Sequence, residues 1–279
     1  MRVTPLTGSL QLTNNGELSL FFVGVGSAFS REHYQTNLLV IKGNDHLLID
    51  CGTICSHALW QYGSVITQIQ NVLITHSHAD HIGGLEEMAF MGRYVSGKKP
   101  VMYIDDNYKT ILWDFSLSGG QTYGESLTGG PLEFEDYFTQ VKPQILAMEP
   151  RPLYETWCEN INIKLFRTKH MENEFEDWDN TFYSIGVLID ERILVTGDTR
   201  FDPELISWLT EKYPTIECIV HDCQLSDGGV HASYNELKNL PADIRSKTLL
   251  CHYGDNWRDY KPESDGFIGF ARQGVYYTF

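Results

Sequence analysis

Short runs of β-branched and aromatic residues recur along the chain, and Gly, Asn, Asp or Pro bounds most of them. Runs of this length with such boundaries are typical of β-strands. The pattern predicts strands at residues 19–23, 37–41, 46–50, 71–75, 101–104, 161–166, 182–189, 192–196, 217–221 and 248–251. Both halves of the chain are therefore rich in strands.

Apolar positions at helical spacing fall between some of these strands and predict helices at residues 55–70, 85–91 and 203–209. Asp202 can cap the third helix, and Pro203 suits its first position. A fourth helix is expected toward Leu240, because Ser233 and Glu236 form a capping box. This mixture predicts an α/β protein with two mixed sheets packed face to face and helices outside.

No internal repeat, low-complexity tract or linker rich in Pro and Ser interrupts the chain, so we expect a single domain over residues 1–279. The stretch at about 105–157 fits the strand rhythm poorly and carries Gly119-Gly120, Gly129-Gly130 and many aromatic residues. We interpret it as an insertion, either a lid over the site or a peripheral helical decoration.

The composition is that of a folded, acidic protein. Of 279 residues, 42% are hydrophobic and 13% aromatic, which excludes a disordered chain. Lys and Arg number 21 against 37 Asp and Glu, so the formal net charge is −16, and a nucleic-acid binder would need a local basic patch. We see no signal peptide or membrane-spanning run, and the six cysteines lie in or beside apolar runs, so we expect a cytoplasmic protein with reduced thiols.

The densest chemical signal is Thr75-His76-Ser77-His78-Ala79-Asp80-His81, which follows the apolar run 72–74. Imidazole and carboxylate groups are ligands of first-row metal ions. Within a bend, His76 and His78 can point to one side, while Asp80 and His81 reach a second position. The segment therefore predicts ligands for two adjacent metals rather than a solvated loop.

Three more candidate ligands, His170, Asp198 and His252, each follow a predicted strand elsewhere in the chain. Each alone is a weak signal, because a strand-end His or Asp is often a capping or surface group. Ligand sites in α/β proteins gather at the carboxyl ends of strands, so together these three can complete the metal site.

These motifs resemble those of the metallo-β-lactamase superfamily: His76-Ser77-His78-Ala79-Asp80-His81, His170, Gly197-Asp198-Thr199 and His252. The resemblance implies an αββα sandwich with a dinuclear site. It implies that His76, His78 and His170 bind one metal, that Asp80, His81 and His252 bind the other, and that Asp198 bridges them. Asp50-Cys51-Gly52 is similar to the family's Asp-x-Gly, whose Asp supports the histidine loop, or is a simple turn after the strand.

The second histidine of the motif limits which metal ions the site is expected to bind. Oxygen-reducing diiron members resemble His-x-Glu-x-Asp, whereas this chain has His78 at the second position. A nitrogen-rich hydrolytic site favours two divalent ions, with Zn²⁺ expected and Mn²⁺ the alternative.

Further segments, at 21–29, 35–37, 219–223 and 228–233, are similar to tRNase Z-like phosphodiesterases. This implies that a metal-bridging hydroxide, oriented by Asp80 and Asp198, attacks phosphorus in line. His231 would donate a proton to the leaving alkoxide, and Asp222 would orient His231. The alternatives are an ordinary helix-entry histidine and a strand-end carboxylate.

The chain departs from tRNase Z in the parts that hold tRNA. No basic arm follows His81 or Asp198, residues 172–179 carry five carboxylates, and the segment after His252 lacks the branch's Ser-x-Arg-Tyr. The chain is closest in type to the anti-Pycsar-like members, phage and bacterial relatives that cleave cyclic mononucleotides. We therefore expect a small phosphodiester such as a cyclic nucleotide as substrate, with no stable nucleic-acid complex and no membrane partner.

The same resemblance raises two structural hypotheses. Aromatic side chains could stack on a base, the candidates being Trp113, Phe115, Tyr123, Trp178 and Trp257. Relatives of this type pair as dimers in which a loop of one protomer closes the other's pocket. We therefore expect a homodimer, with residues 105–157 a candidate for that loop.

Three other functions stay open. The same site could serve a tRNA 3′-end processing endonuclease, or it could hydrolyse a thioester, lactone or sulfate ester. A non-catalytic binding protein that retained the fold is disfavoured, because every expected ligand position holds a residue that can bind metal.

Overall fold

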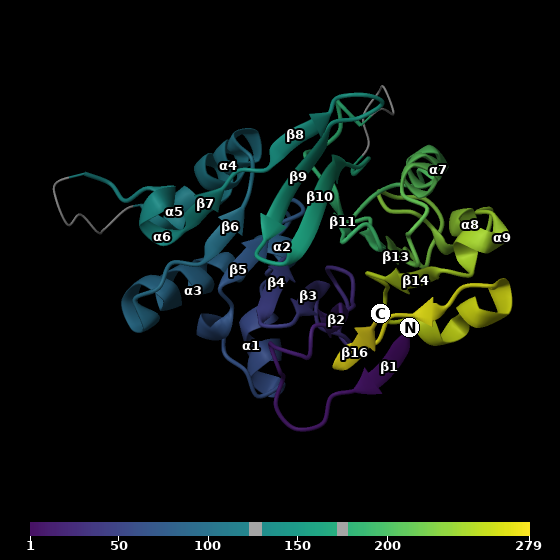
Figure 1. The fold of residues 1–279 in the computed structure, drawn as a ribbon, viewed down its shortest axis with the longest axis horizontal. Helices are drawn as coiled ribbons and strands as arrows, with labels where there is room; N and C mark the ends of the chain where they lie inside the picture. The colour runs from purple at the N-terminus through teal and green to yellow at the C-terminus, as the bar shows by residue number, and fades with distance from the viewer. Residues whose placement is uncertain (123–129, 172–177) are drawn as a thin grey trace. The chain divides into compact units, whose positions relative to one another are not determined.

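The computed structural model describes residues 1–122, 130–171 and 178–279 (Figure 1). Contacts divide the chain into two units, each with its own sheet. The first unit comprises residues 1–24, 37–143 and 274–279, and the second comprises residues 25–36 and 144–273. Among the described residues, no helix is both long enough and apolar enough to cross a membrane.

The first unit contains a mixed sheet whose described strands run in the order β1-β16-β2-β3-β4-β5-β6-β7. The strands are β1 Arg2–Pro5, β2 Ser19–Gly24, β3 Asn37–Lys42, β4 Asp45–Ile49, β5 Asn71–Leu73, β6 Val101–Tyr103, β7 Thr139–Val141 and β16 Val275–Thr278. Pairing is antiparallel from β1 to β4 and parallel from β4 to β7. Strands β1 and β16, far apart in sequence, lie side by side in this sheet (Figure 1).

Short helices complete the described part of the first unit. They are α1 Cys55–Gln61, η1 Ile66–Gln68, α2 Ala79–Ile82, α3 Leu85–Phe90, η2 Met91–Ser96, α4 Asp106–Leu112, η3 Trp113–Leu117, α5 Ser118–Gln121 and α6 Phe134–Tyr137. The helix expected over 55–70 is shorter, because α1 ends at Gln61 and Gly63 takes a left-handed conformation with φ 74°. Such a glycine commonly terminates a helix.

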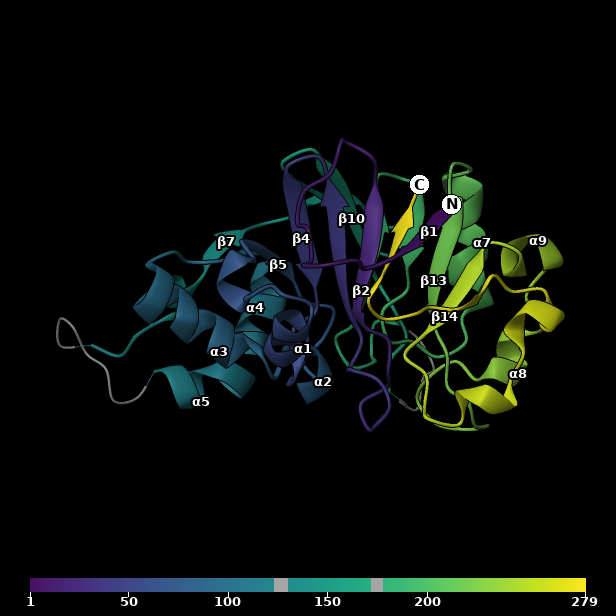
Figure 2. The same cartoon turned by 90° about the horizontal axis from the view of Figure 1, so that it is seen from below.

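The second unit contains a mixed sheet whose described strands run in the order β15-β14-β13-β12-β11-β10-β9-β8. The strands are β8 Gln144–Ala147, β9 Leu153–Cys158, β10 Ile161–Arg167, β11 Ile185–Ile189, β12 Ile193–Val195, β13 Cys218–Asp222, β14 Thr248–Cys251 and β15 Gly269–Phe270. Pairing is antiparallel from β8 to β12 and parallel from β12 to β15. Figure 2 shows the parallel neighbours β13 and β14 side by side.

Two helices of the second unit, α7 Pro203–Lys212 and α8 Tyr234–Leu237, begin where the sequence predicts, whereas the other short helices described there are not predicted. These others are α9 Ala242–Arg245, η4 Trp257–Asp259 and η5 Pro262–Asp265. Asp202 caps α7 by accepting a hydrogen bond from the Leu205 backbone N–H at 3.2 Å. Ser233 and Glu236 form the predicted capping box of α8, although this helix ends at Leu237, short of Leu240.

The sequence pattern predicts several central strands of each sheet because these strands are buried. Strands β11, β12, β13 and β14 are buried along their whole length, as is β2 in the first sheet. A strand covered on both faces is a nearly continuous apolar run, which the sequence shows directly. The two mixed sheets with flanking helices therefore confirm the expected fold class.

The stretch at 105–157 contributes to both units. It contains α4, η3, α5 and α6, the strand β7 of the first sheet, and the strands β8 and β9 of the second, the last ending at Cys158. The pattern does not predict β7 or β8, because both are short and lack buried residues. Residues 123–129, which include Tyr123, and residues 172–177 of the acidic stretch lie outside the described residues. The lid remains a prediction.

Candidate metal centre

The histidine loop of the first unit leaves the end of β5 and leads into α2. His76, Asp80 and His81 are buried, and His78 is half-buried. Nε2 of His76 lies 2.9 Å from Nδ1 of His78, and Nε2 of His81 lies 3.3 Å from a carboxylate oxygen of Asp80. The loop therefore presents two pairs of closely spaced metal-ligating atoms.

Asp50 supports this loop through hydrogen bonds to its carboxylate. Its carboxylate accepts hydrogen bonds from the Thr75 backbone N–H at 2.7 Å, from the Thr75 hydroxyl at 2.9 and 3.0 Å, and from Nδ1 of His81 at 2.7 Å. The Thr75 hydroxyl also lies 3.0 Å from Nδ1 of His76. With Nδ1 engaged, His76 and His81 offer Nε2 as the ligating atom, and this supporting role is the one expected for Asp50.

The second unit places its three expected ligands together at strand ends. His170, Asp198 and His252 are all buried. Oδ2 of Asp198 lies 4.0 Å from Nε2 of His170 and 3.5 Å from Nε2 of His252. Asp198 is therefore within reach of both imidazoles, as a bridging carboxylate must be.

These imidazoles are also oriented through Nδ1. His170 directs Nδ1 to the carbonyl oxygen of Val230 at 3.4 Å, and His252 directs Nδ1 to Asp222 at 3.4 Å. His252 holds a left-handed backbone conformation, with φ 59°, which is uncommon for a side chain of this kind. The surrounding structure therefore determines where the His252 ring points.

Asp222 and His231 form a pair beside these ligands. Nδ1 of His231 donates to Oδ2 of Asp222 at 2.7 Å, and Asp222 also accepts from the Thr199 backbone N–H at 3.0 Å. One ligating atom from each of Asp198, Asp222, His231 and His252 lies within 4.8 Å of the others. The structure therefore brings His231 and Asp222 next to the metal-ligand candidates of the second unit.

Charge sets the protonation of this pair. Burial alone would lower the pKa of His231, but the carboxylates of Asp222 and Asp198 outweigh it and raise the pKa above its ordinary value. Burial likewise opposes ionisation of Asp222, but the imidazole of His231 lowers the pKa of that carboxyl. The pair therefore favours a protonated imidazole beside an ionised carboxylate.

The donors of each unit fit a divalent first-row metal. Four imidazoles, on His76, His81, His170 and His252, turn Nδ1 toward an oxygen acceptor and leave Nε2 for coordination. An oxygen atom facing the second ring nitrogen is typical of metal-binding histidines. The buried carboxylates of Asp80 and Asp198 supply negative charge that a cation would balance.

Sequence reasoning missed two residues that support these ligands. Thr75 could have been noticed, because its hydroxyl stands next to the motif at a strand end. Tyr108, whose hydroxyl oxygen accepts from the Ser77 hydroxyl at 3.2 Å, gave no signal, because it lies on α4, far along the chain.

The aromatic candidates for base stacking are placed differently. Trp113 packs against Phe134 and Tyr137, and the guanidinium of Arg167 lies 6.0 Å from the ring centroid of Trp178. Phe115 is exposed, with 81% of its surface accessible to solvent. The ring of Trp257, by contrast, packs against three other rings, those of His33, Tyr253 and Phe270.

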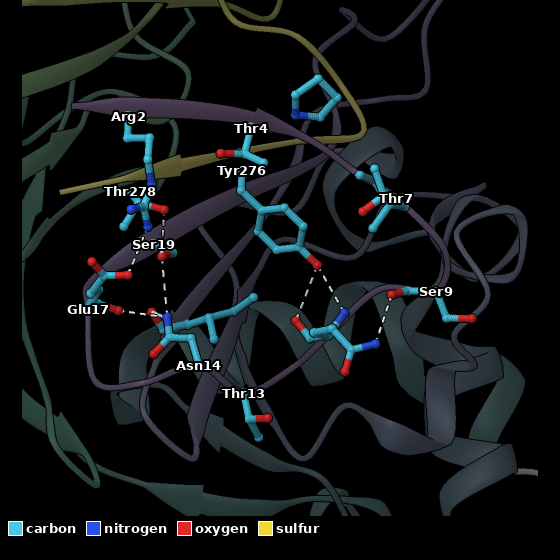
Figure 3. Close-up of a pocket in the computed structure, with 14 residues that line it drawn as sticks. Arg2, Thr4, Thr7, Ser9, Thr13, Asn14, Glu17, Ser19, Tyr276 and Thr278 are labelled. Atoms are coloured by element: carbon cyan, nitrogen blue, oxygen red, sulfur yellow. Dashed lines mark hydrogen bonds and ion pairs between the residues drawn. The ribbon is translucent and has the colours of Figure 1, made fainter.

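A hollow of about 280 Å³ lies elsewhere in the first unit, between the N-terminal segment and β16 (Figure 3). Its polar groups bond mainly to one another. Arg2 pairs with Glu17 at 2.9 Å, and Ser19 lies 3.1 Å from Thr278. Asn14 donates to the Glu17 carbonyl at 2.7 Å. These contacts tie the N-terminal segment to the sheet, and the lining contains no histidine or cysteine.

Comparisons with known proteins identify the family and the fold of the chain. A sequence model of the family described as Anti-Pycsar protein Apyc1 matches residues 18–277. The anti-Pycsar protein Apyc1 of Paenibacillus harenae is 39% identical over 240 residues, covering 86% of this chain and 91% of that protein. The protein of the same name from Bacillus phage vB_BsuM-Goe3 is 35% identical over 271 residues, covering 91% of this chain and 96% of that protein.

Solved structures confirm the fold. The metallo-β-lactamase fold protein YhfI from Bacillus subtilis has a TM-score of 0.65 at 16% identity, over 94% of this chain and 100% of that one. The short form of human tRNase Z has a TM-score of 0.62 at 17% identity, over 93% of this chain and 98% of that one. At these identities the likeness establishes the metallo-β-lactamase fold.

Proposed function

Because the chain belongs to the anti-Pycsar protein Apyc1 family and is a metal-dependent hydrolase, we propose that it is a phosphodiesterase that hydrolyses cyclic nucleotides. The family supports a cyclic-nucleotide substrate. The net charge of −16 and the absence of a basic arm in the sequence favour a small phosphodiester over a polymeric one.

The proposed metal assignment follows the family resemblance. His76, His78 and His170 would bind one divalent ion, Asp80, His81 and His252 would bind the other, and Asp198 would bridge them. Such a pair of ions supplies a deprotonated water and neutralises the charge on the phosphoryl oxygens. The nitrogen-rich donor set favours Zn²⁺, with Mn²⁺ the alternative.

The residues of this chain then have distinct roles. The carboxylates of Asp80 and Asp198 would bind the ions and orient the attacking water. The ligating nitrogens would come from five histidines: His76, His78, His81, His170 and His252. His231, with Nδ1 bonded to Asp222, keeps Nε2 for a proton that it gives to the leaving oxygen. The observation that carries this part of the proposal is the 2.7 Å contact between His231 and Asp222, beside Asp198.

A proton donor is what cyclic-nucleotide hydrolysis requires. Opening the cyclic phosphodiester expels a ribose alkoxide, which is a poor leaving group unless it is protonated. A positioned general acid typically accelerates such a step by about 10²–10⁴-fold. The carboxylates of Asp222 and Asp198 raise the pKa of His231 against the effect of burial, which favours the protonated imidazole that such a step needs.

The deciding experiment offers the purified holoenzyme several substrates side by side. Metal analysis comes first, followed by a panel of cyclic nucleotides, a pre-tRNA, a thioester and a lactone. We expect turnover of one or more cyclic nucleotides and no cleavage of the others. Cleavage of pre-tRNA alone would overturn the proposal in favour of tRNA 3′-end processing, and turnover of the thioester or lactone alone would indicate a different hydrolase.

The homodimer and the cytoplasmic location belong to the same proposal. Light scattering of the purified protein tests the first, with a mass of twice 31.9 kDa expected. A monomer at all concentrations would show that no second protomer closes the pocket.

A further inference from the structure

Tyr108 connects α4 to the centre of the histidine loop. It is 1% exposed, and its hydroxyl oxygen accepts a hydrogen bond from the Ser77 hydroxyl at 3.2 Å. Ser77 stands between the two candidate ligands His76 and His78. We propose that Tyr108 is a positioning residue that sets the geometry of these two histidines through Ser77. The inference concerns the metal site of the proposed function and rests on it.

The helix that carries Tyr108 is itself firmly held. The Tyr108 backbone N–H donates to the Asp105 carboxylate at 3.0 Å, which caps the helix. Lys142 forms an ion pair with Asp106 at 2.8 Å, and Gln140 donates to the Ile104 carbonyl at 3.1 Å. These contacts join both sides of the helix start to β7 and the residue after it, so Tyr108 has little freedom to move.

The loop needs such a support at its centre. Asp50 and Thr75 hold its beginning at His76, and Asp50 holds its end at His81. Neither contact reaches Ser77, whose backbone dihedrals determine how His76 and His78 face each other. Nε2 of His76 and Nδ1 of His78 lie 2.9 Å apart, a separation that a small rotation at Ser77 would change. Tyr108 supplies the contact at that point.

The chemistry of the phenol suits a structural hydrogen bond. Burial raises the pKa of Tyr108 well above its usual range, so the hydroxyl stays neutral and keeps its capacity to accept from Ser77. A neutral hydroxyl brings no charge toward the cation site. The residue therefore supports the loop without competing for the metal.

The experiment measures metal affinity by competition with a chelator, without substrate. We expect Tyr108→Phe to weaken binding of Zn²⁺ about tenfold, the lower range for loss of an outer-shell partner. Ser77→Ala should weaken it by a similar factor. The double variant should lose no more than either single variant, because both remove one hydrogen bond.

Tyr137→Phe is the matched control. Tyr137 is also a buried tyrosine of the first unit, and its hydroxyl donates to the Gln121 carbonyl at 2.7 Å. We expect it to lower the unfolding temperature of the metal-free protein as Tyr108→Phe does, with Zn²⁺ affinity unchanged. Equal affinity in Tyr108→Phe and Tyr137→Phe, or additive losses in the double variant, would overturn the inference.

The result separates this inference from the proposed function. If Tyr108→Phe weakens Zn²⁺ binding while the wild type hydrolyses no cyclic nucleotide, the positioning role stands and the proposed substrate fails. If cyclic nucleotides are hydrolysed and the affinity of Tyr108→Phe matches the wild type, the positioning role fails and the substrate stands.

Discussion

Asp50 shows how one carboxylate can organise several ligands. It is buried, it takes a left-handed conformation with φ 66°, and it accepts hydrogen bonds from Thr75 and His81. Asp and Asn tolerate this conformation better than most residues, which makes Asp50→Asn a variant that can keep the backbone. The side-chain amide, however, would present a donor or a weaker acceptor to Nδ1 of His81.

We therefore predict that Asp50→Asn folds but binds Zn²⁺ about 10- to 100-fold more weakly, as for other outer-shell partners of metal-binding histidines. Chelator competition measures the affinity, and circular dichroism checks the fold. Asp243→Asn, which changes an exposed carboxylate of α9, is the control and should bind Zn²⁺ as the wild type does. Unchanged affinity in Asp50→Asn would mean that Thr75 alone orients the loop.

His231 permits a sharper test, because its role depends on the leaving group. We predict that His231→Ala lowers kcat for a cyclic nucleotide by about 10²–10⁴-fold. Turnover of bis(p-nitrophenyl) phosphate should change far less, because p-nitrophenolate leaves without a proton. Zn²⁺ content should be unchanged. An equal loss on both substrates would assign His231 to binding rather than to proton donation.

At the scale of elements, α7 depends on a buried ion pair at its start. Asp202 accepts from the Leu205 backbone N–H and pairs with Arg151 at 2.5 Å, and the two side chains are 2% and 7% exposed. Removing one partner of a buried pair leaves the other charge uncompensated.

We predict that Asp202→Ala lowers the free energy of unfolding by about 3–5 kcal/mol. Urea denaturation of the metal-loaded protein measures it. Glu211→Ala, an exposed change on the same helix, should shift the value by less than about 0.5 kcal/mol. A loss below about 1 kcal/mol in Asp202→Ala would show that water or another group replaces the carboxylate.

The elements that the sequence could predict are the buried ones. Strands β2, β13 and β14 stand out as apolar runs, and the capping box of α8 is a local signal. Strand β8 could not be predicted, because it is an exposed edge strand whose existence depends on pairing with β9. Apolar runs and helix caps can be recognised from the local sequence, whereas the pairing of an edge strand depends on tertiary context.

The same distinction holds for the candidate site. The candidate ligand residues can be recognised from the sequence, because several His and Asp residues in one short motif are typical of a metal site. Their supports do not, because the contact between Tyr108 and Ser77 joins residues 31 positions apart and exists only once α4 has packed. A sequence shows which residues could bind a metal, but the folded unit decides how their rings are held.

At the scale of the whole molecule, bound cations should stabilise the fold. Each unit gathers buried carboxylates and imidazoles, and a ligand that binds only the folded state adds to its stability. At a free metal concentration of about 100 times Kd, each site contributes about 2.7 kcal/mol.

We predict that EDTA abolishes hydrolysis and lowers the unfolding temperature, and that Zn²⁺ or Mn²⁺ restores both. Calorimetry with and without the chelator measures the change. His57→Ala, which removes an imidazole on α1 outside the expected ligand set, should leave the metal-dependent shift intact. An unfolding temperature that does not respond to EDTA would argue against bound metal in the purified protein.

Net charge predicts how the enzyme responds to salt. With 37 acidic against 21 basic residues, the average field does not attract polyanions. We predict that KM for a cyclic nucleotide changes less than about threefold between about 50 and about 200 mM salt. Any binding of pre-tRNA over this range should be weak. A steep loss of RNA affinity with salt would reveal a basic surface that the overall charge conceals.

Strand β16 has a consequence for how the protein is made. It lies between β1 and β2 in the first sheet, yet it is translated only after the entire second unit has been synthesised. Until then the apolar strand β2 lacks its neighbour on that side, and a strand edge of this kind is prone to aggregate. The nascent chain therefore has an unpaired edge at β2 throughout synthesis of the second unit. This is the period in which a chaperone that covers the edge would do most to prevent aggregation.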